Sequence, residues 1–312
     1  MFGFRHKLAR NGARAGVSLD SQSVAIAALR FQSDHRPVIE YCELYRCQDG
    51  ETPEQALKRA LHSRGAKRTR VFAAASADDY QLLQLEAPEV PATELRSAIR
   101  WRLRDMIDFA IEDAVVDVFE SPEQPRRGEN KTVFAVAARS AAIKKIVDAL
   151  APIAPGFDAI DIPELCARNL SAQLPQDQNG LAMLLLGEQF AQLTITRQGA
   201  LYLARRIEYA RGELSLNGEA PTLDVEAIGA EVRRSLDYYA GQFNQTPIRD
   251  VTLAPAGAKA AALLERLAAD AELRVEILDL SKLADGAEAL GEVTTPQLLA
   301  LGAALRADNA SA

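Results

Sequence analysis

The chain has 312 residues, with 36 Lys plus Arg against 43 Asp plus Glu, which gives a formal net charge of −7. Its 48% hydrophobic and 25% charged residues exclude a wholly disordered chain, and its length suits two domains or one domain with an insertion. The acidic balance, without a basic stripe interleaved with aromatic residues, argues against nucleic acid as the main partner.

No segment of the sequence predicts membrane insertion. The longest apolar run, Leu181–Leu186, is far too short to span a bilayer. Residues 1–10 are too polar for the apolar core of a signal peptide, so we expect a cytoplasmic protein. Residues 1–15 form a basic segment that we expect to be a solvated tail, or alternatively a weak contact with an anionic membrane surface.

The cysteines and histidines do not suggest a metal site. The three cysteines make an odd number, which suits free thiols in a reducing compartment. Cys42 and Cys47 are five positions apart, which matches no common zinc spacing. The three histidines have no carboxylate or cysteine cluster near them in sequence. We therefore predict neither a metal site nor a catalytic triad.

The first predicted unit, residues 16–80, begins with a strand, a tight turn at 20–23 and a second strand at 24–29. A third strand follows at 38–45. Thr52 and Pro53 favour the start of a helix, as N-cap and first helical residue. A short buried strand at 71–75 completes this unit.

Residues 81–157 have a different order of predicted strands and helices, which indicates an inserted subdomain. Strands are expected at 81–85, 114–119 and 131–138, and helices at 91–106 and 141–150, the first with Leu95, Ile99, Leu103 and Met106 on its apolar face. This order is that of a small split βαβ sandwich, which a strand at 157–160 would close.

After this insertion the opening pattern is repeated. Residues 158–178, with a helix at 162–174, return to the first half, and residues 179–312 form the second half. The second half begins with three meandering strands at 181–186, 191–196 and 200–208, and residues 210–222 read as a loop. Helices are expected at 225–243, 258–269 and 295–306, with strands at 251–254 and 273–278. Such an internal duplication is informative about the fold.

Several segments carry a family resemblance, namely GVSLDSQSV at 16–24, residues 197–207 and EVRRSLDYY at 231–239. Two α/β halves that each begin with a hairpin resemble the duplicated, ribonuclease H-like fold of actin and Hsp70. An insertion placed before the second half is similar to the FtsA and PilM branch, and the three segments resemble PilM-type pilus-assembly proteins. ELRSAIRWRLRD at 94–105, followed by AVVD at 114–117, resembles the MshI-type branch of MSHA pilus biogenesis. The resemblance covers almost the whole chain.

The resemblance implies a nucleotide site between the halves, in which the two hairpin turns hold phosphates and a helix with a late Gly-rich turn holds the adenosine. The matching positions are Ser18, Asp20, Ser21, Ser23, Gly187, Glu188, Glu231, Arg234, Ser235 and Gly257. For the three residues on the helix at 225–243, a solvated helix face is the alternative.

This sequence departs from the family pattern where hydrolysis needs carboxylates. Ser18 stands at the Asp position of the first phosphate turn, and Leu185 stands at the Asp position of the second. Asp20 replaces a glycine, and a like charge about 4 Å from a phosphate costs on the order of 4 kcal/mol. The late turn at 254–257 keeps a single glycine. We therefore expect no ATP hydrolysis and no bound cofactor, with ATP–magnesium binding without turnover as the alternative.

What remains is a binding role. In PilM-type proteins, the resemblance implies, a groove between the first half and the inserted subdomain captures the N-terminal tail of a PilN-like inner-membrane protein. Candidate groove residues are Arg100, Trp101, Arg104, Val133, Phe134 and Val136. The alternatives are a solvated arginine face and a Trp101 that packs under a loop of its own subdomain.

The resemblance thus predicts a non-catalytic scaffold at the cytoplasmic face of the inner membrane, held there by its partner, and leaves a homo-oligomer open. The alternatives are an ATP-binding switch of the same fold and a cytoplasmic type II secretion component resembling GspL. A small-molecule kinase is disfavoured, since the sequence lacks a catalytic Asp and two Gly-rich phosphate turns.

Overall fold

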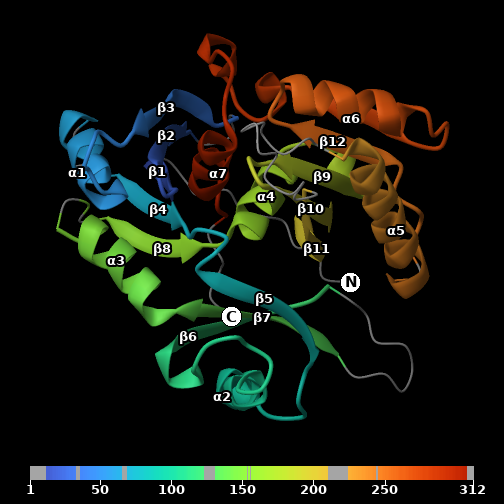
Figure 1. Ribbon diagram of the computed structural model, residues 1–312, viewed down its shortest axis with the longest axis horizontal. Helices are drawn as coiled ribbons and strands as arrows, with labels where there is room; N and C mark the ends of the chain where they lie inside the picture. Colours follow the sequence, from blue (N-terminus) through green and yellow to red (C-terminus); the bar gives the residue numbers. More distant parts are fainter. Residues whose placement is uncertain are drawn as a thin grey trace, which may run out of the picture.

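The computed structural model describes residues 12–32, 36–64, 69–122, 131–152, 154, 156–209, 224–243 and 245–307. Two five-stranded sheets organise the molecule (Figure 1). The first has the order β3-β2-β1-β4-β8, with strands Val38–Arg46, Ser23–Phe31, Gly12–Leu19, Arg70–Ala74 and Phe157–Asp161. The second has the order β11-β10-β9-β12-β13, with strands Ala200–Glu208, Phe190–Arg197, Leu181–Leu186, Asp250–Ala254 and Arg274–Ile277.

The two sheets share one topology. In each, the first three strands in chain order are antiparallel neighbours, and the last two join as parallel strands. The internal repeat read from the sequence is therefore a repeat of structure.

Helices form one layer between the sheets and two outer layers (Figure 1). Between the sheets lie α4 (Pro163–Ser171) and α7 (Thr295–Ala304), and one apolar cluster joins their side chains to both sheets. The outer face of the first sheet packs on α1 (Pro53–Arg64) and α3 (Ser140–Leu150). The outer face of the second sheet packs on α5 (Val225–Phe243) and α6 (Ala258–Ala268). Short 3₁₀ turns occupy Ile111–Asp113, Pro175–Gln178, Leu280–Lys282 and Ala287–Ala289.

The closing helix α7 differs from the sequence expectation, which grouped it with the second half. It packs most extensively on β1 and α4 of the first half, and its side chains are buried on almost every face. Close approach needs glycine, since a Cβ on Gly16 of β1 would lie 1.8 Å from the Ala300 carbonyl oxygen. A helix that is apolar all round must be covered on all sides, so α7 belongs to both halves.

The insertion consists of β5 (Tyr80–Glu86), α2 (Ala92–Leu103), β6 (Ala114–Glu120) and β7 (Thr132–Arg139), and its three strands form a sheet in the order β5-β7-β6. Helix α2 covers one face, where Ile99 and Leu103 are buried. The strand considered as a fourth member, β8, instead pairs in parallel with β4 of the first sheet. Met106, expected on the apolar face of α2, is 49% exposed because the helix ends at Leu103.

The expected basic tail is shorter than predicted. Strand β1 begins at Gly12, and the side chain of Arg14 is buried within the sheet. Its guanidinium lies 4.7 Å from the ring centre of Phe31 and donates a hydrogen bond to the Arg306 carbonyl. Cation–π contact and main-chain bonding make this burial tolerable. Residues 1–11 of the predicted tail and all of the predicted loop at 210–222 lie outside the described residues.

Within the described ranges, no helix combines the length and the apolar character needed to cross a bilayer. Over the same residues, no group of three or more His, Cys, Asp or Glu side chains is arranged to hold a metal ion.

Candidate functional site

The first predicted phosphate turn, between β1 and β2, is closed by its own atoms. The Asp20 N–H donates to the Ser23 carbonyl at 2.9 Å. The Asp20 carboxylate accepts from the N–H and from the hydroxyl of Ser21. Ser18 is buried in the sheet, whereas Asp20 and Ser21 are exposed. The turn therefore presents a carboxylate to solvent and uses the Ser21 N–H that a phosphate would need.

The second predicted turn, between β9 and β10, is occupied by a lysine. The ammonium of Lys259, in the first turn of α6, donates to the carbonyls of Gly187 at 2.8 Å and Glu188 at 3.2 Å. The same ammonium lies 4.7 Å from the ring centre of Tyr209, whose hydroxyl also donates to Gly187. Carbonyl oxygens converge on a cation here, which is the opposite of the N–H cradle that binds phosphate.

Sequence reasoning missed Lys259, although the sequence holds a signal. A cation in the first turn of a helix opposes the helix dipole, so it needs a local acceptor.

Leu185, at the position where the family pattern carries Asp, is buried in the core between the sheets.

The helix residues predicted to touch the adenosine are engaged with one another. The Glu231 carboxylate accepts from Arg205 of β11 at 2.6 Å and from Arg234 at 3.0 Å. Burial would raise the pKa of Glu231, but these two arginines outweigh burial and lower it. The buried hydroxyl of Ser235 donates to the Glu231 carbonyl at 2.8 Å.

Gly257 precedes α6 with φ of 144°, a conformation that favours glycine. The ten predicted nucleotide residues thus fall into three groups: the β1–β2 turn, the β9–β10 turn with the start of α6, and the α5 face beside β11. In each group, side chains or turn atoms are bonded to neighbours in the protein.

The six predicted groove residues do not form one surface, which corrects the expectation. Val133 is buried beneath α2, while Phe134 lies on the opposite face of the sheet and stacks on Phe119 at 5.1 Å. Successive strand residues face opposite sides of the sheet, so Val133 cannot line the same groove as Phe134 and Val136. The Arg100 guanidinium donates to the Ala114 and Ile111 carbonyls of its own subdomain.

Two of the groove residues lie together on the outer side of α2. Trp101 is 72% exposed, and the Arg104 guanidinium lies 5.1 Å from its ring centre. Trp101 therefore does not pack under a loop. Val136 instead belongs to a cluster with Tyr80 and Leu82, at the junction of the insertion and the halves.

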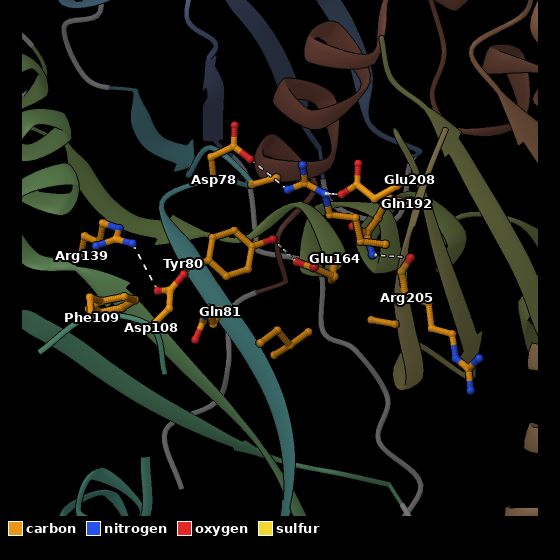
Figure 2. Close-up of a pocket in the computed structure, with 14 residues that line it drawn as sticks. Asp78, Tyr80, Gln81, Asp108, Phe109, Arg139, Glu164, Gln192, Arg205 and Glu208 are labelled. Atoms are coloured by element: carbon orange, nitrogen blue, oxygen red, sulfur yellow. Dashed lines mark hydrogen bonds and ion pairs between the residues drawn. The ribbon is translucent and has the colours of Figure 1, made fainter. Parts of the chain in front are cut away.

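A hollow of about 400 Å³ lies at this junction, where the insertion meets both halves (Figure 2). The sequence placed the groove between the insertion and the first half; Asp78 and Glu164 of the first half do line the hollow, and β10 and β11 of the second half line it as well. Residues that line the hollow are Ala77, Asp78, Tyr80, Gln81, Leu82, Asp108, Phe109, Arg139, Glu164, Gln192, Ala204, Arg205, Arg206 and Glu208.

The hollow contains a buried hydrogen-bonded pair and charged groups. The Tyr80 hydroxyl donates to the carboxyl group of Glu164, which α4 supplies, and burial raises the pKa of both groups. Arg206 forms ion pairs with Asp78 at 2.9 Å and Glu208 at 2.6 Å. The hollow therefore offers both charge signs, hydrogen-bonding groups and apolar surface, a combination that suits a peptide better than a phosphate-bearing ligand.

No protein-family model matches the sequence, and no curated protein matches it. Solved structures do match its fold. The chain is similar to a PilM-PilN type IV pilus biogenesis complex, with a TM-score of 0.70 and 18% identity over 94% of this chain and 97% of that one.

Two further structures match almost the whole chain. The cytoplasmic domain of EpsL, an inner-membrane component of the type II secretion system of Vibrio cholerae, has a TM-score of 0.51 and 14% identity over 93% of this chain and 94% of that one. A Bacteroides thetaiotaomicron protein with an actin-like ATPase fold and unknown function has a TM-score of 0.50 and 11% identity over 96% and 98% of the two chains. The chain has the actin-like ATPase fold, as its sequence predicted.

Proposed function

We propose that this chain is a non-catalytic scaffold of a type IV pilus assembly machine that binds the N-terminal cytoplasmic tail of a PilN-like inner-membrane protein. The observation that carries the proposal is the likeness to the PilM-PilN complex along nearly the whole chain, insertion included. The hollow beside the insertion supplies a site of peptide size and mixed chemistry. The MshI-like segments at 94–105 and 114–117 favour an MSHA-type pilus.

The proposed scaffold works in the cytoplasm, at the inner face of the inner membrane, where its partner holds it. It needs no cofactor for this role. The Lys259 ammonium occupies the second phosphate turn, and Leu185 supplies no carboxylate near it. Asp20 places negative charge at the first turn. These features together support a protein of ATPase fold that does not hydrolyse ATP.

The test is a titration of the purified protein with a synthetic peptide of the partner's N-terminal tail, followed by calorimetry. Micromolar binding is expected, with a scrambled peptide of equal composition as control. Equal heats from the two peptides would contradict the proposal.

The likeness to EpsL favours a second candidate, a cytoplasmic component of a type II secretion system. In that case the cytoplasmic tail of a secretion partner would bind in place of the pilus tail. An ATP-binding switch of the same fold is a third reading, and a thermal shift of several degrees with ATP and magnesium would support it.

A further inference from the structure

The hollow lies between the open edges of two sheets. In the part of the chain that the structure describes, β5 pairs with β7 alone and β11 pairs with β10 alone, so each is an edge strand. Residues of both strands line the hollow. In Figure 2, β5 passes between side chains of the insertion and those of β10, β11 and α4. Edge strands carry unpaired main-chain groups that can bind another extended chain.

The register identifies which groups of β5 point outward. The Arg139 N–H donates to the Asp79 carbonyl at 2.9 Å, and the Ala87 N–H donates to the Lys131 carbonyl at 2.6 Å. In an antiparallel pair, every second residue directs its N–H and C=O groups toward the neighbouring strand. The odd-numbered residues of β5 therefore direct these main-chain groups toward β7. The N–H and C=O groups of Tyr80, Leu82 and Gln84 therefore face away from β7. Arg102 confirms this direction at the far end, because its guanidinium reaches the Glu86 carbonyl at 2.8 Å.

The lining residues place the hollow directly beyond the edge of β5. Tyr80 and Leu82 belong to one face of the strand, and Gln81 belongs to the other. A cavity that touches both faces of a strand lies off its edge. The side-chain Oε1 atom of Gln81 is buried and accepts no hydrogen bond from the described residues.

Strand β11, the opposite wall of the hollow, also has main-chain groups that point outward. The Tyr209 N–H donates to the Gln189 carbonyl at 3.1 Å, so the odd-numbered residues of β11 direct their main-chain groups toward β10. Ala204, Arg206 and Glu208 direct their main-chain groups away from β10, and all three line the hollow. An ion pair joins Arg206 of β11 to Asp78, which lies in the turn just before β5.

We propose that the hollow binds an extended peptide segment, which adds as a strand to the free edge of β5 with β11 as the opposite wall. Main-chain hydrogen bonds to Tyr80, Leu82 and Gln84 supply affinity, and the alternate side chains of the segment supply specificity. This inference rests on the proposed function, because it describes how the partner's tail is held.

The test removes one outward N–H from each wall. Leu82→Pro deletes an edge N–H that is not part of the ladder with β7, a position where strands tolerate proline. Leu82→Ala removes the side chain and keeps the N–H, and Ala204→Pro makes the matching change in β11. With the synthetic tail peptide, Leu82→Pro is expected to weaken binding at least about tenfold more than Leu82→Ala does, because only Leu82→Pro removes the edge N–H. It is also expected to weaken binding more than Ala204→Pro does, because the proposed main-chain hydrogen bonds are made to β5. Circular dichroism and a melting curve verify the fold of each variant.

A second measurement keeps the unaltered protein and changes the peptide. Methylation of alternate backbone nitrogens blocks hydrogen bonds on one edge of an extended peptide. One set of alternate positions is expected to abolish binding, while the other set preserves it. Equal tolerance of both sets, or unchanged affinity in a folded Leu82→Pro variant, overturns strand addition and leaves the proposed function standing. No binding of the unmodified peptide by the unaltered protein overturns both.

Discussion

At the scale of single residues, Lys259 is the side chain that most directly supports our proposal that the β9–β10 turn holds no phosphate. Its ammonium joins α6 to the β9–β10 turn through the carbonyls of Gly187 and Glu188, and it rests on the ring of Tyr209. A nucleotide phosphate in this turn would meet carbonyl oxygens as soon as the lysine moved away. The lysine therefore has a structural role, since it ties the start of α6 to the turn.

Replacing this lysine should destabilise the protein without creating a nucleotide site. Lys259→Met leaves the carbonyls of the turn without their donor, so the free energy of unfolding should fall by about 1–2 kcal/mol in urea titrations. Lys144→Met is the matched control, since Lys144 is exposed and forms an ion pair with Asp148 one helical turn away. Equal stability of the two variants would contradict the assigned role, and ATP should bind neither.

Glu164 should make stability depend on pH in a definite direction. Burial raises the pKa of its carboxyl above the ordinary value of 4.5. Between the unfolded pKa and the folded pKa, the folded protein therefore binds more protons than the unfolded chain. This stabilisation is fully present below the unfolded pKa and is lost as pH rises through the folded pKa.

Glu164→Gln keeps a hydrogen-bond acceptor for Tyr80 and cannot ionise. Urea unfolding from about pH 4 to about pH 8 should therefore show the variant gaining stability relative to the unaltered protein as pH rises. A constant difference across that range would mean that Glu164 titrates as it does in the unfolded chain.

At the scale of elements, the packing of α7 against the first half depends on small residues. A Cβ on Gly302 of α7 would lie 2.4 Å from the Cys166 carbonyl oxygen of α4. A main-chain atom in a packed interface cannot move aside cheaply, so contact between these helices requires glycine.

Two helical glycines offer a matched comparison. Gly302→Ala should lower the free energy of unfolding by about 1–3 kcal/mol through overpacking. Gly241→Ala in α5 should raise it by about 0.5–1 kcal/mol, because a Cβ there meets nothing within 4 Å and alanine favours the helix. Thermal and urea unfolding measure both, and a stabilised Gly302→Ala variant would show that α4 and α7 are not in close contact.

The spacing of apolar residues predicted the helices and strands, because an element that buries one face must place apolar residues at regular intervals. This spacing does not indicate which surface each apolar face contacts. Strand β8 could have closed the insertion, but it pairs with β4, and α7 packs on the first sheet. Trp101 was correctly separated from the apolar face of α2, whereas Val133 and Phe134 could not share a groove. Lys259 was missed because its acceptors lie about 70 residues away in sequence.

At the scale of the whole molecule, the two sheets have one topology and a common core. The cluster that α4 and α7 share joins side chains of both sheets, so the halves are packed together through one apolar core. This shared core fixes how the two halves pack on either side of α4 and α7.

The most direct test of this account is calorimetry of the unaltered protein with the partner-tail peptide, in the presence and absence of saturating ATP and magnesium. The account predicts no heat from ATP itself and the same micromolar affinity for the peptide in both conditions. Tight ATP binding, or a peptide affinity that changes with ATP, would contradict it and would indicate that the turns around Asp20 and Gly187 still serve a nucleotide switch.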